Sequence, residues 1–354
     1  MTTEIPSPSS IRKFIEASIR GLPSDKKDRE KQIAFYGGSF TAIPQEDQVC
    51  YLEEAQPFLK SGLIHSVRIS TRPDALDEEV LSLLKEYGVK TVEIGVQSMI
   101  DEILILSRRG HWPEDTLSAT SRLRRWDFEV GIHLMIGLPG DTCDRFLQSL
   151  DQVIDLKPDF LRIHPTLVLQ GSPLESLWRT GKYSPLSLEE TVHWLKAALF
   201  KLEGSPIRVA RIGLQPTREL ERHLLAGPYH PALHQLIDSE IFFEMAKQLL
   251  QIYSKEPEVL FLCHPKEVSN LRGQRNGNIL KLKEQFQPNE ITIQMRKDIP
   301  RATLVLQNQK GKFSIHRRDL YSFDSNLYNP SRPPLPTGRQ ALLKGGKNVS
   351  FPLL

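Results

Sequence analysis

The chain alternates between short apolar runs and longer stretches in which apolar residues recur every three or four positions. The short runs, several of them rich in β-branched residues, predict strands that are buried on both faces. The longer stretches predict amphipathic helices, and one of them opens with Ser187 and Glu190 at the spacing of a capping box. The predicted strands are residues 33–36, 67–70, 91–96, 130–136, 160–168 and 209–214.

Strands that alternate with helices in this way predict repeated right-handed βαβ units and a parallel sheet. The periodicity leaves two α/β folds open, an open doubly wound sheet and a partial (βα) barrel. In both folds, ligands bind where the strands end and the following loops begin. We therefore expect functional residues at the carboxyl ends of the predicted strands.

The pattern changes after residue 255 and divides the chain into three predicted segments. Residues 1–255 are expected to form the α/β domain. Residues 256–322 contain further short strands with a hairpin turn at 308–311, which predicts a small α+β domain. Residues 323–354 are rich in Pro, Gly, Arg and Lys without periodicity, which predicts a disordered tail.

The composition is that of an ordinary globular protein, with 39% hydrophobic and 25% charged residues. A formal net charge of +3 permits contact with nucleic acid without requiring it. No apolar run approaches the roughly 20 residues that span a bilayer, so no membrane partner is expected. Cys50, Cys143 and Cys263 are too far apart in sequence for a disulfide framework, and they indicate a reducing cytoplasm.

A glycine motif closes the first predicted strand, where Tyr36, Gly37, Gly38 and Ser39 follow one another. Paired glycines at a strand end let the backbone turn tightly and approach a ligand without a Cβ in the way. Their carbonyl groups could then accept hydrogen bonds from an ammonium group. An ordinary glycine turn explains the same motif equally well.

The next two predicted strands also end in polar side chains. Ser70 and Arg72 offer a hydroxyl and a guanidinium group at the expected ligand face. Gln97 can donate and accept, which suits a ribose hydroxyl or an adenine edge, although it could also cap a neighbouring loop. Asp74 and Asp141 are expected only to cap the helices that follow them.

Four more candidate positions continue the series. Arg109 lies in a basic loop, residues 108–111, that would bind a carboxylate or a phosphate unless it is simply solvated. His133 lies within the fourth predicted strand, Gly137 follows that strand, and His164 lies near the end of the fifth. Each position is a weak signal alone, because a lone histidine is more often structural. Polar or glycine signals at five successive strand ends together favour a ligand site.

Six segments, in this order and at these spacings, resemble the radical S-adenosylmethionine (SAM) domain of the Elongator catalytic-subunit family and its shorter bacterial relatives. They are FYGGSF, STRPD, VEIGVQSM, SRRGH, IGLPGDT and IHPTLVLQGSPL, within residues 6–322. The resemblance implies an α/β fold, a partial (βα)6 TIM-like barrel lacking its first strand and cluster loop, with a small α+β C-terminal appendage. It also implies SAM across the strand ends, a [4Fe–4S] cluster and an external electron donor.

The resemblance further implies roles for four residues. Gly37 and Gly38 would accept the methionyl ammonium group of SAM. Gln97 would contact SAM, and Arg109 would pair with the methionyl carboxylate. Ser70 departs from the family pattern, because many members carry a ribose-binding glutamate at this place.

The cluster ligands are the main departure from the family. Its members hold the cluster with three cysteines in a CxxxCxxC motif. Cys50, Cys143 and Cys263 do not reproduce this motif, so no metal ligands are assigned. Either the start of the sequence is truncated, or the protein is a natural relative without the cluster. The retained SAM-contact residues favour a truncated start.

Two classes of function follow. The first is a radical SAM enzyme that cleaves SAM reductively, with the 5′-deoxyadenosyl radical acting on an unknown substrate, for which RNA is one candidate. The alternative is a cluster-less SAM- or nucleotide-binding module, or an RNA-associated scaffold. The appendage is too short for the acetyltransferase domain of the Elongator subunit, so acetyl transfer is not implied. Its basic residues allow weak contact with RNA.

Overall fold

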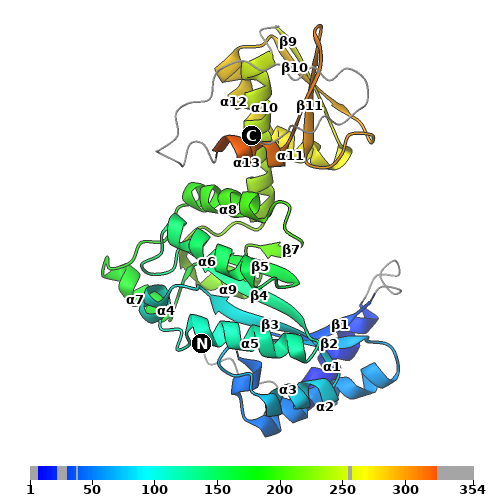
Figure 1. Ribbon diagram of the computed structural model, residues 1–354, viewed down its shortest axis with the longest axis vertical. Coiled ribbons are helices and arrows are strands. Elements are labelled where there is room, and N and C mark those ends of the chain that lie inside the picture. The colour runs from blue at the N-terminus through cyan, green and yellow to red at the C-terminus, as the bar shows by residue number, and fades with distance from the viewer. Residues whose placement is uncertain (1–6, 22–29, 37–38, 254–256, 325–354) are drawn as a thin grey trace. The chain divides into compact units, whose positions relative to one another are not determined.

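The computed structural model describes residues 7–21, 30–36, 39–253 and 257–324 (Figure 1). Contacts divide the chain into two compact units, one ending at Pro231 and the other beginning at Ala232. We expected this boundary after residue 255. It lies earlier because helix α10 (Leu233–Tyr253) packs against α11, α12, β11 and β12 of the second unit.

The first unit is built on one six-stranded parallel sheet (Figure 1). All six predicted runs take part in it, and the strand order follows the order of the chain. A doubly wound sheet would reverse its strand order at a switch point, so the structure confirms the partial barrel. The strands are β1 (Gln32–Phe35), β2 (Ser66–Thr71), β3 (Val89–Gln97), β4 (Glu129–Ile136), β5 (Phe160–Pro165) and β7 (Arg208–Ile212).

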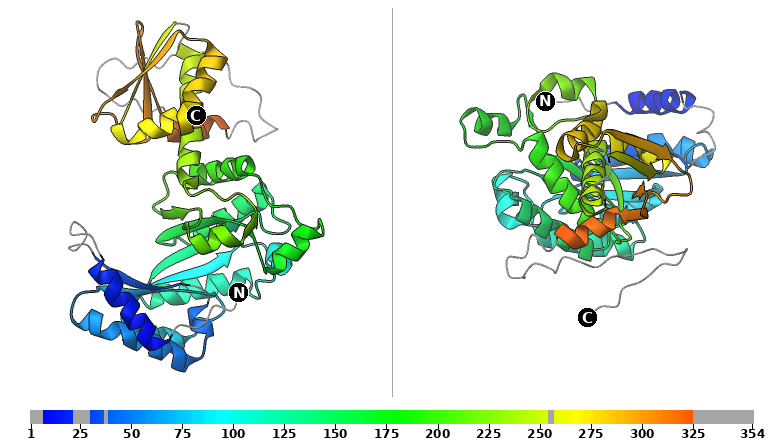
Figure 2. Two further views of the ribbon diagram at one scale, coloured as in Figure 1. Left: turned by 180° about the vertical axis from the view of Figure 1, so that it is seen from behind. Right: turned by 90° about the horizontal axis from the view of Figure 1, so that it is seen from above.

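Helices connect these strands, and α3, α5 and α6 pack against β3 and β4 (Figure 2). A short antiparallel pair, β6 (Val168–Leu169) with β8 (Leu224–Ala226), accompanies the sheet. The helices of the first unit are α1 (Pro8–Arg20), η2 (Phe40–Ala42), α2 (Gln45–Lys60), α3 (Glu78–Glu86), α4 (Asp101–Leu106), α5 (Pro113–Arg125), α6 (Cys143–Asp155), α7 (Pro173–Arg179), α8 (Leu188–Leu202) and α9 (Arg218–His223).

The helix starts were only partly predicted. Ser187 and Glu190 form the expected capping box of α8. The predictions for Asp74 and Asp141 are wrong, because the side chain of Asp77 caps α3 and that of Thr142 caps α6. Asp77 stands three positions after Asp74, and Thr142 stands one position after Asp141.

The two faces of the sheet differ, which corrects the prediction of strands buried on both faces. Ile69, Ile94 and Ile132, on the helix-covered face, are fully buried. The alternate positions of the strands carry polar side chains, among them Arg68 and His133, which keep partial exposure. The apolar face forms the core, and the inner face of the curled sheet is polar.

The second unit is a four-stranded sheet in the order β10-β9-β11-β12, with β9 parallel to β10 and the other pairs antiparallel. Its predicted strands and hairpin are confirmed. The unit contains α10, β9 (Glu258–Cys263), η3 (Pro265–Glu267), α11 (Val268–Arg272), η4 (Gln274–Asn276), α12 (Gly277–Phe286), β10 (Glu290–Met295), β11 (Thr303–Asn308), β12 (Gly311–His316) and α13 (Arg317–Asp324). Of the predicted tail, residues 325–354 lie outside the described residues. Among the described helices, none has the length and apolar character needed to cross a bilayer.

Candidate ligand-binding site at the strand ends

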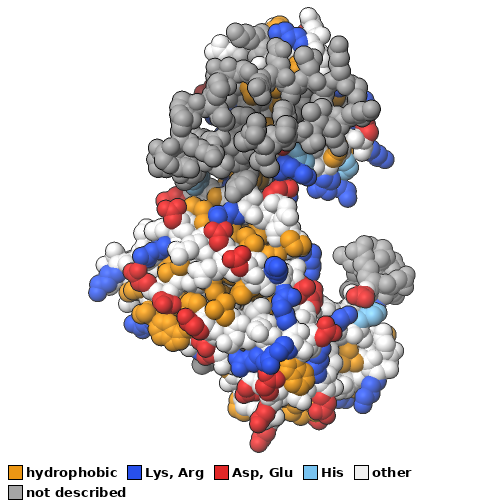
Figure 3. Space-filling model, in the orientation of Figure 1, with side chains coloured by type: hydrophobic (Ala, Val, Ile, Leu, Met, Phe, Trp, Pro, Cys, Tyr) orange, Lys and Arg blue, Asp and Glu red, His pale blue; other side chains and the backbone are white. Residues whose placement is uncertain are grey.

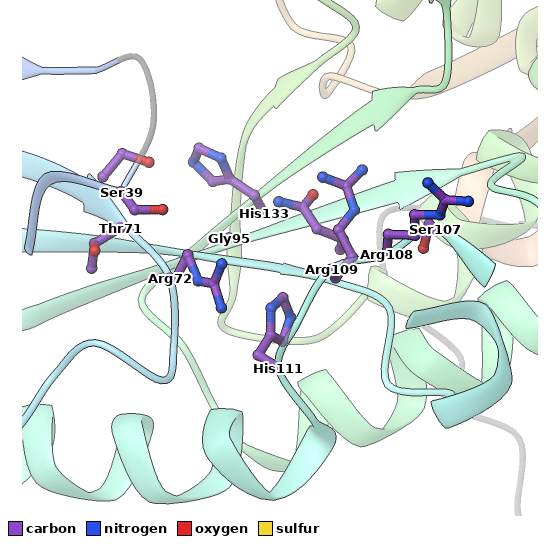
Figure 4. A pocket seen from close by; sticks show the side chains of 11 residues that line it. Ser39, Thr71, Arg72, Gly95, Ser107, Arg108, Arg109, His111 and His133 are labelled. Carbon is purple, nitrogen blue, oxygen red and sulfur yellow. The ribbon is translucent and has the colours of Figure 1, made fainter. Parts of the chain in front are cut away.

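A pocket of about 400 Å³ lies at the carboxyl ends of β2, β3 and β4 (Figure 4). Figure 4 shows the lining side chains arranged around a common space, although they come from segments far apart in the sequence. The lining is almost entirely polar. It consists of Ser39, Ser70, Thr71, Arg72, Gly95, Gln97, Ser107, Arg108, Arg109, His111 and His133.

A local irregularity at the end of β3 places Gln97 in the pocket. The pairing of β3 with β4 shifts register between Ile94 and Gln97, and Gln97 has a φ of 66°, a value that side-chain-bearing residues rarely adopt. A Cβ at Gly95 would lie 2.9 Å from Nε2 of Gln97. The glycine therefore leaves room for the Gln97 amide beside the strand.

Arg109 contributes a partly buried positive charge to the pocket. Its Nη2 lies 3.0 Å from the sulfur of Met135, and its buried Nε has no hydrogen-bond partner. Burial lowers the pKa of Arg109, because a charged group loses solvation away from water. No carboxylate among the described residues forms an ion pair with this guanidinium group. An anionic ligand would supply the missing partner.

Arg72 lines the same pocket, but its guanidinium group already has partners within the protein. It donates to both carboxylate oxygens of Asp74, at 2.9 and 2.5 Å, and to the carbonyl oxygen of Gly110 at 2.8 Å. His111, in the same loop, is within hydrogen-bond distance of the Val96 carbonyl oxygen, at 3.1 Å. Arg72 and His111 thus hold the basic loop against the ends of β2 and β3.

Glu93 forms the polar centre of the inner face, directly below the pocket. Its fully buried carboxylate accepts from Tyr36 Oη at 2.8 Å and from Arg68 Nη1 at 2.7 Å. His133 Nε2 is also hydrogen-bonded to it. Arg162 donates from Nη2 to Oε1 at 3.3 Å, and its Nε lies 2.8 Å from Oε2 as an ion pair. Glu93 thereby links side chains that come from β2, β4, β5 and the end of β1.

The charge of Glu93 follows from these contacts. Burial alone would raise its pKa, but hydrogen bonds from His133 and Arg68 outweigh that effect and lower the pKa to about 2. The carboxylate is therefore ionised at neutral pH. It fixes the position of His133, whose ring lines the pocket.

The predicted site residues fall into three groups: those that line the pocket, those that lie outside the described residues, and those that lie elsewhere in the structure. The pocket brings together Ser39, Ser70, Arg72, Gln97, Arg109 and His133. Gly37 and Gly38 lie outside the described residues.

The remaining three predicted residues do not line the pocket. The hydroxyl of Tyr36 is bound to Glu93, and the His164 ring centroid lies 5.5 Å from that of His133. Gly137 has a local structural role, because it donates its N–H to the Asp141 carboxylate at 3.0 Å and accepts from the Tyr183 hydroxyl at 2.7 Å.

Sequence reasoning missed Arg68, Glu93 and Arg162. Arg68 and Arg162 stand two residues before the predicted site residues Ser70 and His164, and Glu93 stands four residues before Gln97. Residues two apart on a strand point to the same face. Following this alternation back from each strand end would have found them.

The cysteines do not converge on a metal site. Cys50 lies in α2, Cys143 is the first residue of α6, and Cys263 lies in β9 of the second unit. Burial raises the pKa of both Cys143 and Cys263 to about 11, so these thiols stay protonated at neutral pH. Within the described part of the chain, no group of three metal-ligating side chains is present.

Comparison with known protein families adds to this geometry. Residues 15–153 match the Radical SAM superfamily, and residues 158–242 match the Radical_SAM C-terminal domain. The chain belongs to the radical SAM superfamily. Together the two matches cover the six-stranded sheet and the short β6–β8 pair. All the residues that line the pocket lie within the first match.

Individual relatives of this radical SAM protein include a tRNA uridine(34) acetyltransferase and an Elongator complex protein. The tRNA uridine(34) acetyltransferase of Methanocaldococcus jannaschii is 34% identical over 189 residues, which cover 52% of this chain and 35% of the relative. The human Elongator complex protein 3 is 28% identical over 196 residues, covering 50% of this chain and 36% of the relative. The chain thus matches little more than a third of the length of these relatives.

A solved structure shows a similar arrangement. Archaeal Elp3 of Methanocaldococcus infernus, with residues 1–46 deleted, is 28% identical and superposes with a TM-score of 0.57. The similarity covers 68% of this chain and 59% of the archaeal protein. The partial barrel expected from the sequence is therefore the fold of a solved relative.

Proposed function

We propose that the pocket at the ends of β2, β3 and β4 binds SAM, and that the chain provides the SAM-binding barrel of a radical SAM enzyme. The observation that carries this proposal is the convergence of six predicted contact residues on one pocket. Its volume of about 400 Å³ suits a ligand of this size. The unpartnered, buried Nε of Arg109 calls for an anion, and SAM carries a carboxylate.

In this proposal, different residues of the pocket bind different parts of SAM. Arg109 pairs with the methionyl carboxylate, and Gln97 and Ser70 bind the ribose or adenine through their polar groups. Arg72 holds the basic loop closed over the strand end instead of binding SAM. SAM, when bound in a radical SAM enzyme, is the source of the 5′-deoxyadenosyl group.

The iron–sulfur cluster of the family does not fit the cysteines of this chain. Cys50, Cys143 and Cys263 lie on separate elements, and two of the three thiols are protonated at neutral pH. We therefore assign no step of SAM cleavage, and no electron donor, to the residues described. A cluster-less SAM- or nucleotide-binding module is the second candidate function, because it requires none of these cysteines as ligands.

RNA is the substrate class that the name of the archaeal tRNA uridine(34) acetyltransferase supports. The visible face of the first unit has basic and acidic side chains interspersed, without a patch of one sign (Figure 3). The RNA proposal therefore depends on the relatives and not on the electrostatics of this surface. A cytoplasmic location, expected from the cysteines, stays a prediction.

The test is a calorimetric titration of the 354-residue chain with SAM. We expect Arg109→Ala to weaken SAM affinity by about 1.5–3 kcal/mol, the magnitude of a hydrogen bond to a charged group. The matched control is Arg125→Ala, which removes an exposed guanidinium group paired with Glu78 on the helix-covered side. Equal affinities for both variants would remove Arg109 from the site, and no binding by the unaltered chain would refute the proposal.

A titration with ATP in parallel separates the two candidate functions. A radical SAM barrel should prefer SAM, because Arg109 is matched to the methionyl carboxylate. A general nucleotide-binding module should bind ATP at least as tightly as SAM. Formation of 5′-deoxyadenosine from SAM under anaerobic, reducing conditions would establish the enzyme directly.

A further inference from the structure

A group of basic side chains lies beside the pocket, on the inner face of β5 and β7. Arg162 and Arg211 are direct neighbours in the register of these two parallel strands, so their side chains start from the same face of the sheet. Like charges placed opposite each other destabilise a sheet. The arrangement therefore needs a compensating anion.

The acidic groups of the protein compensate this charge only in part. Arg162 shares the Glu93 carboxylate with Arg68, which also lies 3.8 Å from Glu129. Arg211 forms no ion pair with any residue that the structure describes. The neighbouring Arg208 differs, because it lies near Glu129 at 3.4 Å and above the Phe160 ring.

His164 adds an unused hydrogen-bonding group next to the two arginines. Its Nε2 is buried and has no partner among the described residues. Burial, followed by the charges of His133, Arg162 and Arg211, lowers its pKa to about 4. The imidazole is therefore neutral at pH 7, and its N–H can donate without adding a third fixed positive charge.

We infer that Arg162, His164 and Arg211 form a subsite for an oxyanion, such as the phosphate or carboxylate group of a substrate. Guanidinium groups bind oxyanions through paired N–H donors, and a neutral imidazole can add one more donor. This subsite borders the proposed SAM pocket through His133, which lines that pocket and is the register partner of Arg162. The assignment of this anion to a substrate that lies beside SAM rests on the proposed function, whereas anion binding itself does not.

The subsite is distinct from the place proposed for the SAM carboxylate. Arg162, His164 and Arg211 do not line the pocket, whereas Arg109 does. An anion bound at the subsite should therefore leave SAM binding intact. The substrate class that follows is a molecule with an oxyanion held on the β5–β7 side while its remainder extends towards the strand ends.

The test is a calorimetric titration of the full chain with inorganic phosphate, and separately with acetate, at matched ionic strength. We expect one of these anions to bind in the millimolar range or tighter, in the presence and in the absence of saturating SAM. Preferential binding of phosphate or of acetate identifies the oxyanion of the substrate. Binding of neither anion overturns the inference, as does loss of anion binding when SAM is present.

Substitutions of two arginines on β7 test whether the anion binds there. Arg211→Gln should weaken the anion affinity at least about tenfold, as expected for the loss of a charged hydrogen bond. Arg211→Lys should recover part of it, because the charge is kept. Arg208→Gln, on the same strand, is the control and should stay within about twofold of the unaltered chain. An Arg211→Gln variant that binds the anion as tightly as the control would place the site elsewhere.

The outcome separates this inference from the proposed function. Anion binding that depends on Arg211 in a chain that binds no SAM supports the subsite and refutes the SAM proposal alone. SAM binding without any anion binding refutes the subsite alone.

Discussion

At the scale of single residues, Glu93 determines the charge balance of the inner face. Its carboxylate is fully buried, and it compensates positive charge on Arg68 and Arg162 while binding His133. Removing one member of a buried ionic network leaves the remaining charges uncompensated. The loss of a partly exposed pair costs far less, because water replaces the missing partner.

Glu93→Gln should therefore destabilise the protein by about 3–5 kcal/mol, because two guanidinium groups lose their shared counter-charge. The measurement is urea unfolding at pH 7. Glu129→Gln is the matched control, since Glu129 is partly exposed and lies 3.4–3.8 Å from its arginine partners. We expect the control to lose less than about 1 kcal/mol.

The difference in unfolding free energy between the unaltered chain and Glu93→Gln should depend on pH. The Glu93 pKa is lowered from 4.5 to about 2 in the folded protein, so its stabilising contribution is fully present above pH 4.5. It is lost as the pH falls towards about 2. The difference in unfolding free energy between the unaltered chain and Glu93→Gln should shrink over this range. A difference that stays constant would mean that the charge of Glu93 is not the stabilising feature.

The residues of the site were predictable where each one ends a strand, and not where contacts between strands decide. Ser70, Gln97 and Arg109 follow local signals, and the structure brings them to one pocket. The hydrogen bond from Arg72 to the Gly110 carbonyl depends on a loop 38 residues later in the chain, which no local pattern reveals. Glu93 was missed because its strand was read as apolar on both faces.

At the scale of elements, the inner face of the sheet depends on a close contact between two neighbouring strands. Gly131 of β4 is paired with Phe160 of β5, and a Cβ at Gly131 would lie 2.3 Å from the Phe160 ring. The ring in turn lies beneath the guanidinium groups of Arg68 and Arg208, at 5.0 and 5.1 Å from its centroid. The glycine gives the aromatic ring room to lie across the sheet.

Gly131→Ala should consequently destabilise the protein by about 1–3 kcal/mol, the usual result of overpacking a buried contact. Gly21→Ala is the control in the same unit, because Gly21 has ordinary helical φ and its added Cβ would have no neighbour closer than 3.4 Å. Thermal unfolding of the two variants checks the prediction. Equal transition temperatures would show that Phe160 can move aside without loss.

The strands and helices were largely predictable, because each contains its own periodic signal and local stop. The exceptions are decided by local contacts within the loops. Asp77 caps α3 in place of Asp74, whose carboxylate is bound to Arg72 two residues earlier. Thr142 caps α6 in place of Asp141, which accepts the N–H of Gly137 four residues earlier. A carboxylate engaged in its own loop is unavailable to cap the helix that follows.

At the scale of the whole molecule, the division into two units could not be placed from the sequence. The helix α10 follows the first unit directly along the chain. Its partners, among them α12 and β11, follow it later in the chain and form the second unit. Contacts between distant segments decide to which unit a helix belongs.

The distribution of cysteines over both units leads to another prediction. Anaerobic reconstitution of the 354-residue chain with iron and sulfide should give no [4Fe–4S] absorbance, because the three thiols lie on separate elements. Triple substitution of Cys50, Cys143 and Cys263 by serine is the control, and its spectrum should match that of the unaltered chain. A brown cluster that disappears in the triple variant would contradict this account of the cysteines.

The central claim is that the polar ends of β2, β3 and β4 hold SAM in one pocket. A crystal structure of the chain grown with SAM tests it most directly. The account predicts the methionyl carboxylate within hydrogen-bond distance of Arg109, and the nucleoside beside Gln97 and Ser70. SAM bound away from these residues, or a pocket that stays empty at saturating SAM, would contradict it.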